Sequence, residues 1–591
     1  VDSVEGLPVE IPAGGSAIVE VAFTPRAAVD YTATLQIGHS GQNDPSEVLL
    51  LGNGSGPPLA FDKSTLANTA LSNPTSLQFG PDGRLYVAEQ NGTINAYTID
   101  RTGPQNFEVA ATETINLIKT IPNHNDDGSL NPEVTDRLIT GILVVGTSDN
   151  PVIYVTSSDP RVGAGPSGFD LNLDTNSGVV SRLTRNGTAW EKLDLVRGLS
   201  RSEENHANNG LQLDETTNTL YVAIGGNTNM GAPSNNFALL PEYALSAAIL
   251  SIDLDAIGET TYDLPTLDDE DRPGTIDLND PFGGNDGKNQ AKLVPGGPVQ
   301  VYAPGFRNPY DLVITESGRM YSSDNGPNAG WGGVPVGEGP EGNATNEPSE
   351  PGESYGDGLH FITGPGYYGG HPNPTRSNLS NTFNSSNPQS PVSVANPIES
   401  DYQAPQPNAQ GQNLNGSLLT FGASTGGLTE YTASSFAGQM IGHLLLTSFD
   451  NTVKRIELNS DGDQVLSSEN LFSSVGAAPL DVTTQGDFDV FPGTIWVADY
   501  ITGSIYVFEP NETTGFCPGD DDCDGYTNED EDANGSCNMD GVQDPVLCAP
   551  CTQVEGACMN ECGECELCFG MTELPPECDE QECPEGQQAC G

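Results

Sequence analysis

Cysteine is absent from the first 516 residues of this 591-residue chain, because all 12 cysteines lie between Cys517 and Cys590. Lys and Arg are scarce as well. The 20 basic residues stand against 82 acidic ones, which gives a formal net charge of −62, and six of the 20 are lysines. Binding to nucleic-acid phosphates or to anionic lipid surfaces depends on Lys and Arg. This composition therefore excludes nucleic-acid binding and disfavours anionic membrane surfaces.

Long hydrophobic runs are missing too. No apolar stretch approaches the ~20 residues that a membrane-spanning helix needs, so we expect no transmembrane segment. The chain begins at Val1 without a signal peptide or an initiator Met, and we expect a mature product or a fragment of a longer protein. Hydrophobic residues still make up 35% of the sequence, and 70 glycines add to them. This share is typical of a globular protein rather than of a disordered acidic polymer.

The cysteines are concentrated in an acidic C-terminal segment. The last 75 residues carry 20 of the 82 acidic residues and no Lys or Arg. Cysteines at this density predict a disulfide framework formed in an oxidising compartment, and hence an extracellular or cell-surface protein. Spacings such as Cys548-x-x-Cys551 also fit zinc or a metal cluster, but the even number of cysteines favours disulfides. The disulfide connectivity cannot be deduced from the sequence.

Residues 1–57 predict short antiparallel strands. Apolar and polar residues alternate in Ser16–Phe23 and Tyr31–Ile37, and a third apolar run follows at Glu47–Leu51. The pattern resembles the second half of an immunoglobulin-like module. Because the first half is absent, strand edges would be left unpaired. We expect an upstream segment, a partner protein or the following domain to cover them.

Residues 58–510 contain a degenerate repeat in which apolar strands follow Gly-, Asp- and Asn-rich turns. No window in this region predicts a long amphipathic helix, so the fold class is all-β. Six recurrences of about 75 residues each favour a six-bladed β-propeller over a sandwich. The recurrences are Ser76–Val87, Gly141–Val155, Gly210–Val222, Asp311–Tyr321, His443–Leu458 and Gly493–Phe508.

Three motifs in the predicted propeller have residue types suited to chemistry. His206 precedes a blade strand, where a side chain would face the central channel of such a fold. Arg307 and Asn308 in "GFRNP" offer a planar donor fork and directional amide bonds. Asp324–Asn328, "DNGPN", offers side-chain and backbone oxygens of the kind that calcium prefers. Taken singly, each motif also fits an ordinary polar loop or a hairpin turn.

In this order the three motifs resemble the glucose/sorbosone dehydrogenase family. The resemblance covers roughly residues 65–510 and includes "NPTSLQFGPDGRLYVAEQNGTI", "NHANNGLQLDETTNTLYVAIGG", "YAPGFRNPYDLVITESGRMYSSDNGPN" and "SYGDGLHFITGPGYYGGHPNP". It implies a six-bladed propeller that uses pyrroloquinoline quinone (PQQ) with calcium to oxidise an aldose at C1. His206 would be the general base, and Arg307 and Asn308 would contact the substrate and the quinone. The carbonyls of Gly326 and Pro327 would bind the calcium ion.

The sequence departs from the family at two places. Gly226 stands where the family often has an Asp that orients the histidine, and residues 417–453 lack the Lys and Arg that clamp the cofactor. Lys454 and Arg455 follow, but the pattern predicts that they point outward. A second interpretation therefore stays open: a non-catalytic extracellular propeller for adhesion, glycan binding or surface assembly. In either case the expected ligand is a carbohydrate or another small molecule.

Residues 511–591 predict a small calcium-binding module stabilised by disulfides. The pattern Asp-x-Asp-x-Asp-Gly-x5-Glu matches a twelve-position calcium loop and resembles thrombospondin type 3 repeats. A solvated acidic run is the alternative. The predicted ligands are Asp520, Asp522, Asp524, the Tyr526 carbonyl, Asn528 and Glu531.

Overall fold

The computed structural model describes most of the propeller region and short strands on either side of it. The described residues are 3–5, 20–22, 30–37, 46–53, 58–163, 172–187, 189–266, 281–284, 289–335, 349–376, 399, 401–422, 424–511, 553–554, 557–559 and 565–567. The chain divides into two compact units. One consists of residues 62–434 and 440–509, and the other consists of residues 1–61, 435–439 and 510–591.

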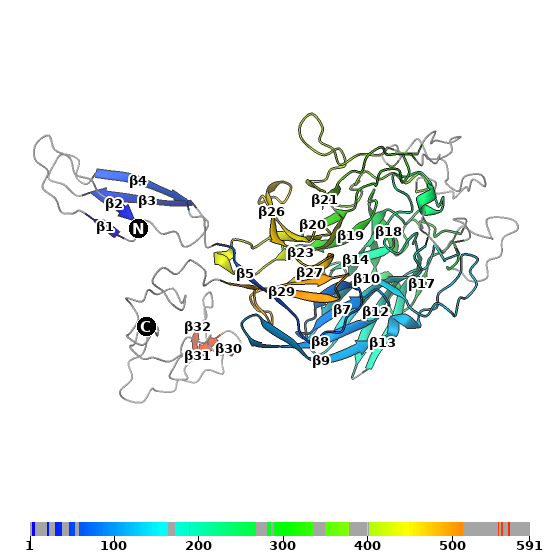
Figure 1. Ribbon diagram of the computed structural model, residues 1–591, viewed down its shortest axis with the longest axis horizontal. Helices are drawn as coiled ribbons and strands as arrows, with labels where there is room; N and C mark the ends of the chain where they lie inside the picture. Colours follow the sequence, from blue (N-terminus) through cyan, green and yellow to red (C-terminus); the bar gives the residue numbers. More distant parts are fainter. Residues whose placement is uncertain are drawn as a thin grey trace, which may run out of the picture. The chain divides into compact units, whose positions relative to one another are not determined.

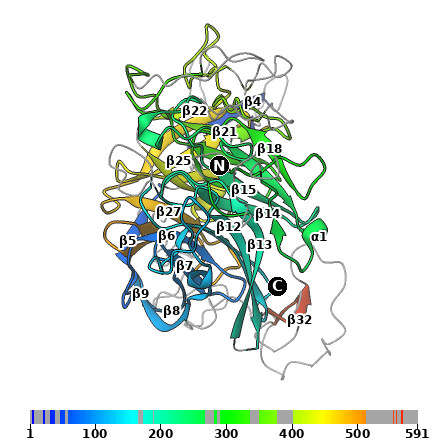
Figure 2. The same cartoon turned by 90° about the vertical axis from the view of Figure 1, so that its right-hand side faces the viewer.

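Six sheets, five of four strands and one of five, make up most of the described chain, and Figures 1 and 2 show how they are arranged. Blade one is β6 (Pro74–Phe79), β7 (Leu85–Glu89), β8 (Ile94–Gly103) and β9 (Asn106–Ile115). Blade two is β10 (Leu138–Gly146), β11 (Pro151–Ser158), β12 (Gly178–Asn186) and β13 (Ala189–Leu199), with β17 (Tyr262–Asp263) added parallel to β13. Blade three is β14 (Asn208–Asp214), β15 (Thr219–Ile224), β16 (Ala248–Asp253) and β18 (Val299–Pro304).

Blade four is β19 (Pro309–Ile314), β20 (Met320–Asp324), β21 (Asp357–Ile362) and β22 (Leu419–Phe421). Blade five is β23 (Thr425–Tyr431), β24 (His443–Ser448), β25 (Thr452–Leu458) and β26 (Val465–Ser473). Blade six is β27 (Pro479–Thr484), β28 (Ile495–Asp499), β29 (Ser504–Pro510) and β5 (Phe61–Thr65). The helical segments are short: η1 (Leu117–Thr120), η2 (Asn235–Phe237), α1 (Leu254–Ile257) and η4 (Phe436–Gly438).

The sheets form a closed ring. Each innermost strand contacts the innermost strand of the next blade, and β27 of blade six contacts β6 of blade one. Blade six takes its outer strand, β5, from the start of the propeller sequence and its other three strands from the end. Just after β5, the Leu66 N–H donates a 2.9 Å hydrogen bond to the Ile505 carbonyl. The predicted all-β, six-bladed β-propeller is confirmed.

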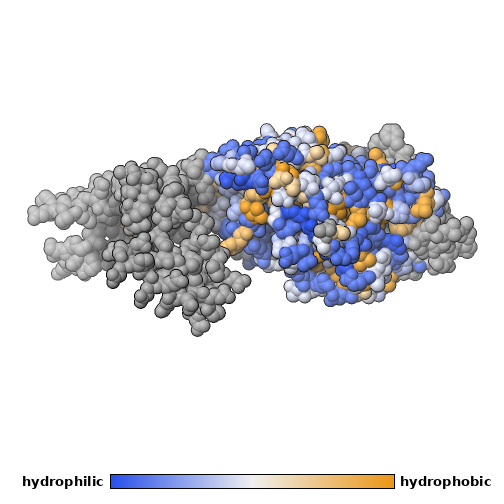
Figure 3. Space-filling view, turned by 90° about the horizontal axis from the view of Figure 1, so that it is seen from below, coloured by the Kyte–Doolittle hydropathy of each residue, from blue (hydrophilic) through white to orange (hydrophobic). Residues whose placement is uncertain are grey.

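Each sheet is packed on both faces, because its neighbours in the ring cover it. Every residue of β7 and β28 is buried, whereas every residue of the outer strand β26 is exposed or half-buried. Between blades six and one, Trp496 packs edge-to-face on Phe107, with ring centroids 5.3 Å apart. Burial of apolar side chains between sheets therefore stabilises the ring. The face in Figure 3 is mostly hydrophilic, and its hydrophobic residues are scattered.

Two buried aspartates connect neighbouring blades around a central channel that the innermost strands line. Asp481 of β27 accepts a 2.8 Å hydrogen bond from the Leu77 N–H of blade one. Asp311 of β19 accepts a 2.9 Å bond from the Leu428 N–H of blade five. Burial, together with the charge of Asp481, raises the pKa of Asp311 well above its ordinary value. The carboxyl groups thus satisfy backbone donors at the junctions between sheets.

The second unit contains small sheets. The strand β1 (Ser3–Glu5) pairs with β2 (Glu20–Ala22), and β3 (Asp30–Ile37) pairs with β4 (Ser46–Asn53). The strands β2, β3 and β4 overlap the predicted apolar runs, β1 was not predicted, and the immunoglobulin-like architecture stays a prediction. In the tail, β30 (Gln553–Val554), β31 (Ala557–Met559) and β32 (Cys565–Leu567) form a three-stranded sheet. The predicted calcium loop and the disulfide pairing lie outside the described residues.

In the part of the chain that the structure describes, no helix is long and apolar enough to cross a membrane.

The Asp481 link across the ring closure yields a first prediction. In Asp481→Ala, the Leu77 and Val482 N–H groups lose the carboxyl oxygens that accept their hydrogen bonds. Leaving buried donors unpaired costs free energy, so we expect the free energy of unfolding to fall by about 2–4 kcal/mol. Urea titration at pH 5 measures this change. Asp461→Ala, at an exposed turn, is the matched control and should change it by less than about 0.5 kcal/mol.

The effect of Asp481→Ala should also depend on pH. Burial raises the pKa of Asp481 to about 7, above the ~3.9 of an unfolded Asp. The stability contributed by the protonated group is therefore fully present below about pH 4 and is lost as the pH rises through about 7. We expect the difference between wild type and variant to shrink over that interval. A difference that grows with pH would contradict this assignment.

Candidate functional site

The residues that the motifs single out lie at one end of blades three and four. His206 comes two residues before β14, and Arg307 comes two residues before β19. In each blade the first strand starts beside the end of the second, and Pro309 is thus paired with Asp324. Both β14 and β19 carry a β-bulge near their start. Bulges at such positions redirect side chains at the rim of a sheet.

Hydrogen bonds connect the His206 loop, the "GFRNP" turn and the "DNGPN" turn. The Asp324 carboxylate accepts hydrogen bonds from the backbone N–H groups of Arg307 (3.0 Å) and Asn308 (2.7 Å). The Asn308 amide donates to the Asn205 carbonyl at 2.8 Å. The Gly226 N–H donates to the Arg307 carbonyl at 2.7 Å. The loop that contains His206 and the turn that contains Arg307 are therefore held against each other.

His206 is a buried, neutral histidine. Its side chain is 2% exposed, and its ring packs edge-to-face on Phe237 with centroids 5.0 Å apart. Nδ1 lies 3.0 Å from the Gly226 carbonyl oxygen, which can only accept, so the proton is on Nδ1 and the lone pair is on Nε2. Burial and the nearby charge of Arg307 lower the pKa of His206 well below its ordinary value. The ring can therefore accept a proton at Nε2 but holds it weakly.

Arg307 is a buried cation with one unused donor. Nε donates to Asn229 Oδ1 at 3.2 Å, and Nη1 donates to the Asn325 carbonyl at 3.4 Å. Nη2 is buried and has no hydrogen-bond partner. Burial lowers the pKa of Arg307, and the charge of Asp324 opposes that shift. An unpaired buried donor is costly, so Nη2 is suited to an oxygen atom of a ligand.

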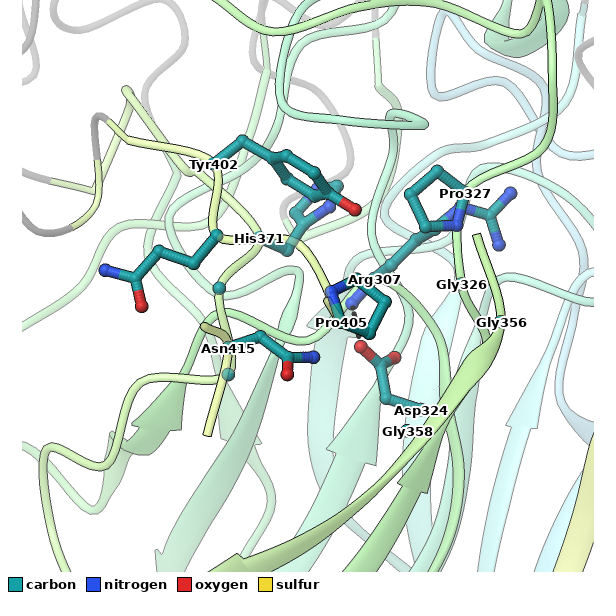
Figure 4. A pocket seen from close by; sticks show the side chains of 13 residues that line it. Arg307, Asp324, Gly326, Pro327, Gly356, Gly358, His371, Tyr402, Pro405 and Asn415 are labelled. Carbon is teal, nitrogen blue, oxygen red and sulfur yellow. Dashed lines mark hydrogen bonds between the residues drawn. The ribbon is translucent and has the colours of Figure 1, made fainter. Parts of the chain in front are cut away.

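A cavity that opens to solvent lies next to this donor (Figure 4), with about 280 Å³ of unfilled space that includes its open part. Two more unpartnered buried polar atoms belong to its lining: Nδ1 of His371 and Oη of Tyr402. Figure 4 shows both side chains around the cavity together with Arg307. The lining residues are Arg307, Asp324, Gly326, Pro327, Gly356, Gly358, Gly369, Gly370, His371, Tyr402, Gln403, Pro405 and Asn415.

The histidine that lines the cavity is not the predicted one. His371 lines the cavity, whereas His206 is not among the described lining residues. His371 lies in the "GYYGGHPNP" segment, and its place in a Gly-rich loop after a blade strand was a signal that could have marked it. The amide of Asn308 is already bonded to Asn205 and Asn209, so Asn308 first serves to hold the loops.

The predicted calcium ligands, the carbonyls of Gly326 and Pro327, belong to residues that line the same cavity. The Pro327 carbonyl accepts a 3.0 Å hydrogen bond from the Tyr355 N–H, which leaves one of its lone pairs. The Gly326 N–H donates to Asp357 Oδ1 at 2.9 Å. Within the described ranges, no group of three or more His, Cys, Asp or Glu residues is placed to hold a metal ion. A calcium ion here would therefore depend on backbone carbonyls.

Buried carboxyl groups surround Arg307. Burial raises the pKa of Glu203 to about 8, of Asp324 to about 7 and of Asp357 to about 6. These groups are partly protonated at neutral pH, so the site is less negative than its composition indicates. This lowers the electrostatic cost of binding an anionic ligand beside Arg307.

Two differences from the family pattern have a structural explanation. A Cβ atom at Gly226 would lie 2.8 Å from Oε1 of Glu242, so the place of the family's aspartate is occupied by an acid from another segment. Lys454 is paired with Asp450 at 2.9 Å, and Arg455 is paired with Glu469 at 2.7 Å. Neither cation lines the cavity.

Comparison with known proteins shows likeness in fold. No protein-family model and no curated protein matches the sequence. A calcium structure of the Trichoderma reesei carbohydrate-active enzyme family AA12 is 14% identical, with a TM-score of 0.45, over 77% of this chain and 97% of its own. PQQ-bound aldose sugar dehydrogenase from Streptomyces coelicolor is 15% identical, with a TM-score of 0.40, over 77% and 100%. The PQQ domain of Coprinopsis cinerea pyranose dehydrogenase is 11% identical, with a TM-score of 0.41, over 77% and 99%.

The proximity of Arg307 and His206 can be tested by titration. Because the charge of Arg307 opposes protonation of the imidazole, Arg307→Gln should raise the pKa of His206. Burial remains the larger cause, so the pKa should still lie below the ordinary value of ~6.5. NMR of histidine-labelled protein measures the titration, and Arg319→Gln, on an exposed hairpin, is the control. An unchanged His206 titration in Arg307→Gln would show that the two groups are not close.

Proposed function

We propose that the chain is a sugar dehydrogenase-like propeller that oxidises an aldose at C1, with PQQ as the hydride acceptor and calcium as the activating metal. One observation carries the proposal: a buried, neutral histidine stands beside a buried arginine that has an unpartnered donor. His206 supplies a lone pair for a proton, and Arg307 supplies a donor for an oxygen atom. A base and a cation at this proximity suit the removal of a hydroxyl proton.

The donor set fits an oxygen-rich cofactor. The unpartnered Arg307 Nη2 and Tyr402 Oη line one cavity and would hold quinone or carboxylate oxygens. The carbonyls of Gly326 and Pro327 are hard ligands of the kind that calcium takes. When bound, PQQ would accept a hydride, and calcium would polarise the quinone carbonyl. Arg307 is the one cation among the described lining residues, so we expect it to dominate cofactor affinity.

His206 and Asp324 have separate roles in the proposed reaction. His206 accepts the C1 hydroxyl proton at Nε2, while its Nδ1–H bond to the Gly226 carbonyl keeps the ring in that tautomer. Asp324 holds the turn that carries Arg307 through two backbone hydrogen bonds. Because burial and Arg307 make protonated His206 unstable, the proton leaves readily once the product is formed.

Two measurements test this function. Purified protein should bind PQQ in the presence of calcium and then reduce a dye when an aldose is added. His206→Asn should retain PQQ binding but lose about 10²–10⁴-fold in turnover, the range for a general base. His443→Asn, which alters a histidine on blade five, should leave turnover unchanged. If wild type neither binds PQQ nor turns over any aldose, the enzyme assignment is wrong.

A non-catalytic extracellular propeller for adhesion, glycan binding or surface assembly is the second candidate. The observation that favours it is that Lys454 and Arg455 are paired with acidic residues outside the cavity. One lining arginine would then have to balance a cofactor with three carboxylates. Glycan binding without any PQQ binding would support this candidate.

We also propose that residues 520–531 bind calcium in an extracellular or cell-surface setting. The support is the spacing of the acidic residues in the sequence, Asp-x-Asp-x-Asp-Gly-x5-Glu. Isothermal titration of the full chain with calcium should show a site that is lost in Glu531→Gln. Glu555→Gln, outside the motif, is the control. An unchanged number of calcium sites in Glu531→Gln would exclude this loop.

A further inference from the structure

A second histidine of the site is held by a buried carboxylate. His371 Nε2 lies 2.7 Å from Glu242 Oε1, and the two side chains are 2% and 0% exposed. Glu242 comes from the connection between β15 and β16, and His371 comes from the connection between β21 and β22. The His371 N–H also donates to the Gly305 carbonyl at 2.8 Å, so both the backbone and the ring of His371 are fixed.

The surroundings of Glu242 keep it ionised. Its Oε2 accepts hydrogen bonds from the Asn227 N–H (3.0 Å) and from the Ser246 hydroxyl, and its Oε1 accepts one from the Thr228 hydroxyl (2.6 Å). Burial opposes ionisation of Glu242, but the hydrogen bond from His371 and those from the Ser246 and Thr228 hydroxyls favour the carboxylate and lower the pKa of Glu242. An ionised carboxylate can only accept, so the proton of the His371 ring that faces it is on Nε2.

The other ring nitrogen is thereby left as an acceptor. Nδ1 of His371 is buried and has no partner, and His371 lines the cavity. Arg307 Nη2, in the same lining, is a donor only, and Tyr402 Oη can do either. The cavity therefore presents one fixed acceptor, Nδ1 of His371, beside the donors that would hold cofactor oxygens. A sugar hydroxyl can donate a hydrogen bond to that acceptor. A carboxylate or phosphate group carries no proton for Nδ1 at pH 8.

We propose that His371, positioned by Glu242, is a specificity-determining residue that accepts a hydrogen bond from a ligand hydroxyl group at Nδ1. The proposal rests on the proposed function in taking a sugar as the ligand of this cavity, and it requires no oxidation step. Glu242 is the positioning residue, because it fixes which nitrogen of His371 carries the proton. A ligand that lacks the recognised hydroxyl leaves Nδ1 unpaired and is rejected.

The substitution Glu242→Gln converts this acceptor into a donor. The Gln amide must place its NH2 group where one carboxylate oxygen stood. The oxygen position that receives the Asn227 N–H cannot take an NH2 group, so the NH2 group faces His371 Nε2 instead. His371 then accepts at Nε2 and carries its proton on Nδ1. This change of tautomer preserves size and burial, so it separates recognition from a merely structural role.

The experiment uses the full chain at pH 8 and has two readouts. Nitrogen-15 NMR of labelled histidines should show Nε2–H for His371 in wild type and Nδ1–H in Glu242→Gln. Calorimetry should show that wild type binds an aldose at least about 10-fold more tightly than one of its mono-deoxy analogues. That ratio should fall to about one in Glu242→Gln and in His371→Leu, while Glu399→Gln, at a buried Arg376 pair outside the lining, retains it.

The outcomes separate this proposal from the proposed function. Equal affinity of wild type for the aldose and all its mono-deoxy analogues, or Nε2–H retained in Glu242→Gln, would overturn the role of His371. Absence of aldose binding would overturn both proposals. Discrimination between the sugars without any dye reduction would support His371 and contradict the dehydrogenase assignment. If the variants prove unstable, the tautomer and the deoxy series in wild type still decide the question.

Discussion

Closure of the ring by β5 is the constraint on which the rest of the propeller depends. A propeller blade cannot bury both faces unless it has a neighbour on each side, so an open ring would expose two sheets. In this chain the closing blade combines a strand from the beginning of the propeller sequence with three from its end. The Asp481–Leu77 hydrogen bond and the Trp496–Phe107 contact then connect blades six and one. Non-local pairing of this kind slows the folding of β proteins, because the loop-closure entropy must be overcome first.

The closed ring fixes the geometry of the functional site. His206 and Arg307 belong to different blades, and each lies just outside an innermost strand whose position its neighbours in the ring determine. Between the two blades, the Asn209 amide donates both to Asn308 Oδ1 and to the Pro309 carbonyl. A relative shift of blades three and four would break these bonds before it changed either sheet. The hydrogen bonds of the site are therefore intact only when blades three and four keep their positions in the ring.

Sequence reasoning recovered the fold because the repeated strands carry local information. Alternating or continuous apolar runs between Gly-rich turns occur six times and predict one blade each, as in Ser76–Val87. The resemblance to the glucose/sorbosone dehydrogenase family implied one site for His206 and Arg307, and each of them precedes the first strand of a blade. Sequence reasoning missed the pair of Glu242 and His371, which are 129 residues apart and lie in two long connections. No periodicity or spacing links such residues, because their contact arises only when blades three and four are assembled.

The scarcity of cations in the sequence also has a structural meaning. Arg137, Arg201 and Arg376 are buried and donate to backbone carbonyls of the loops around the strand ends. A buried guanidinium can satisfy several such acceptors at once, which an apolar side chain cannot. These arginines therefore serve the interior of the propeller rather than its surface. Arg307 differs from these three arginines in one respect: its free Nη2 borders a cavity. The chain has few positive charges, and the buried Arg307 keeps one donor without a partner beside the cavity. A ligand that accepts a hydrogen bond from Nη2 best explains this arrangement.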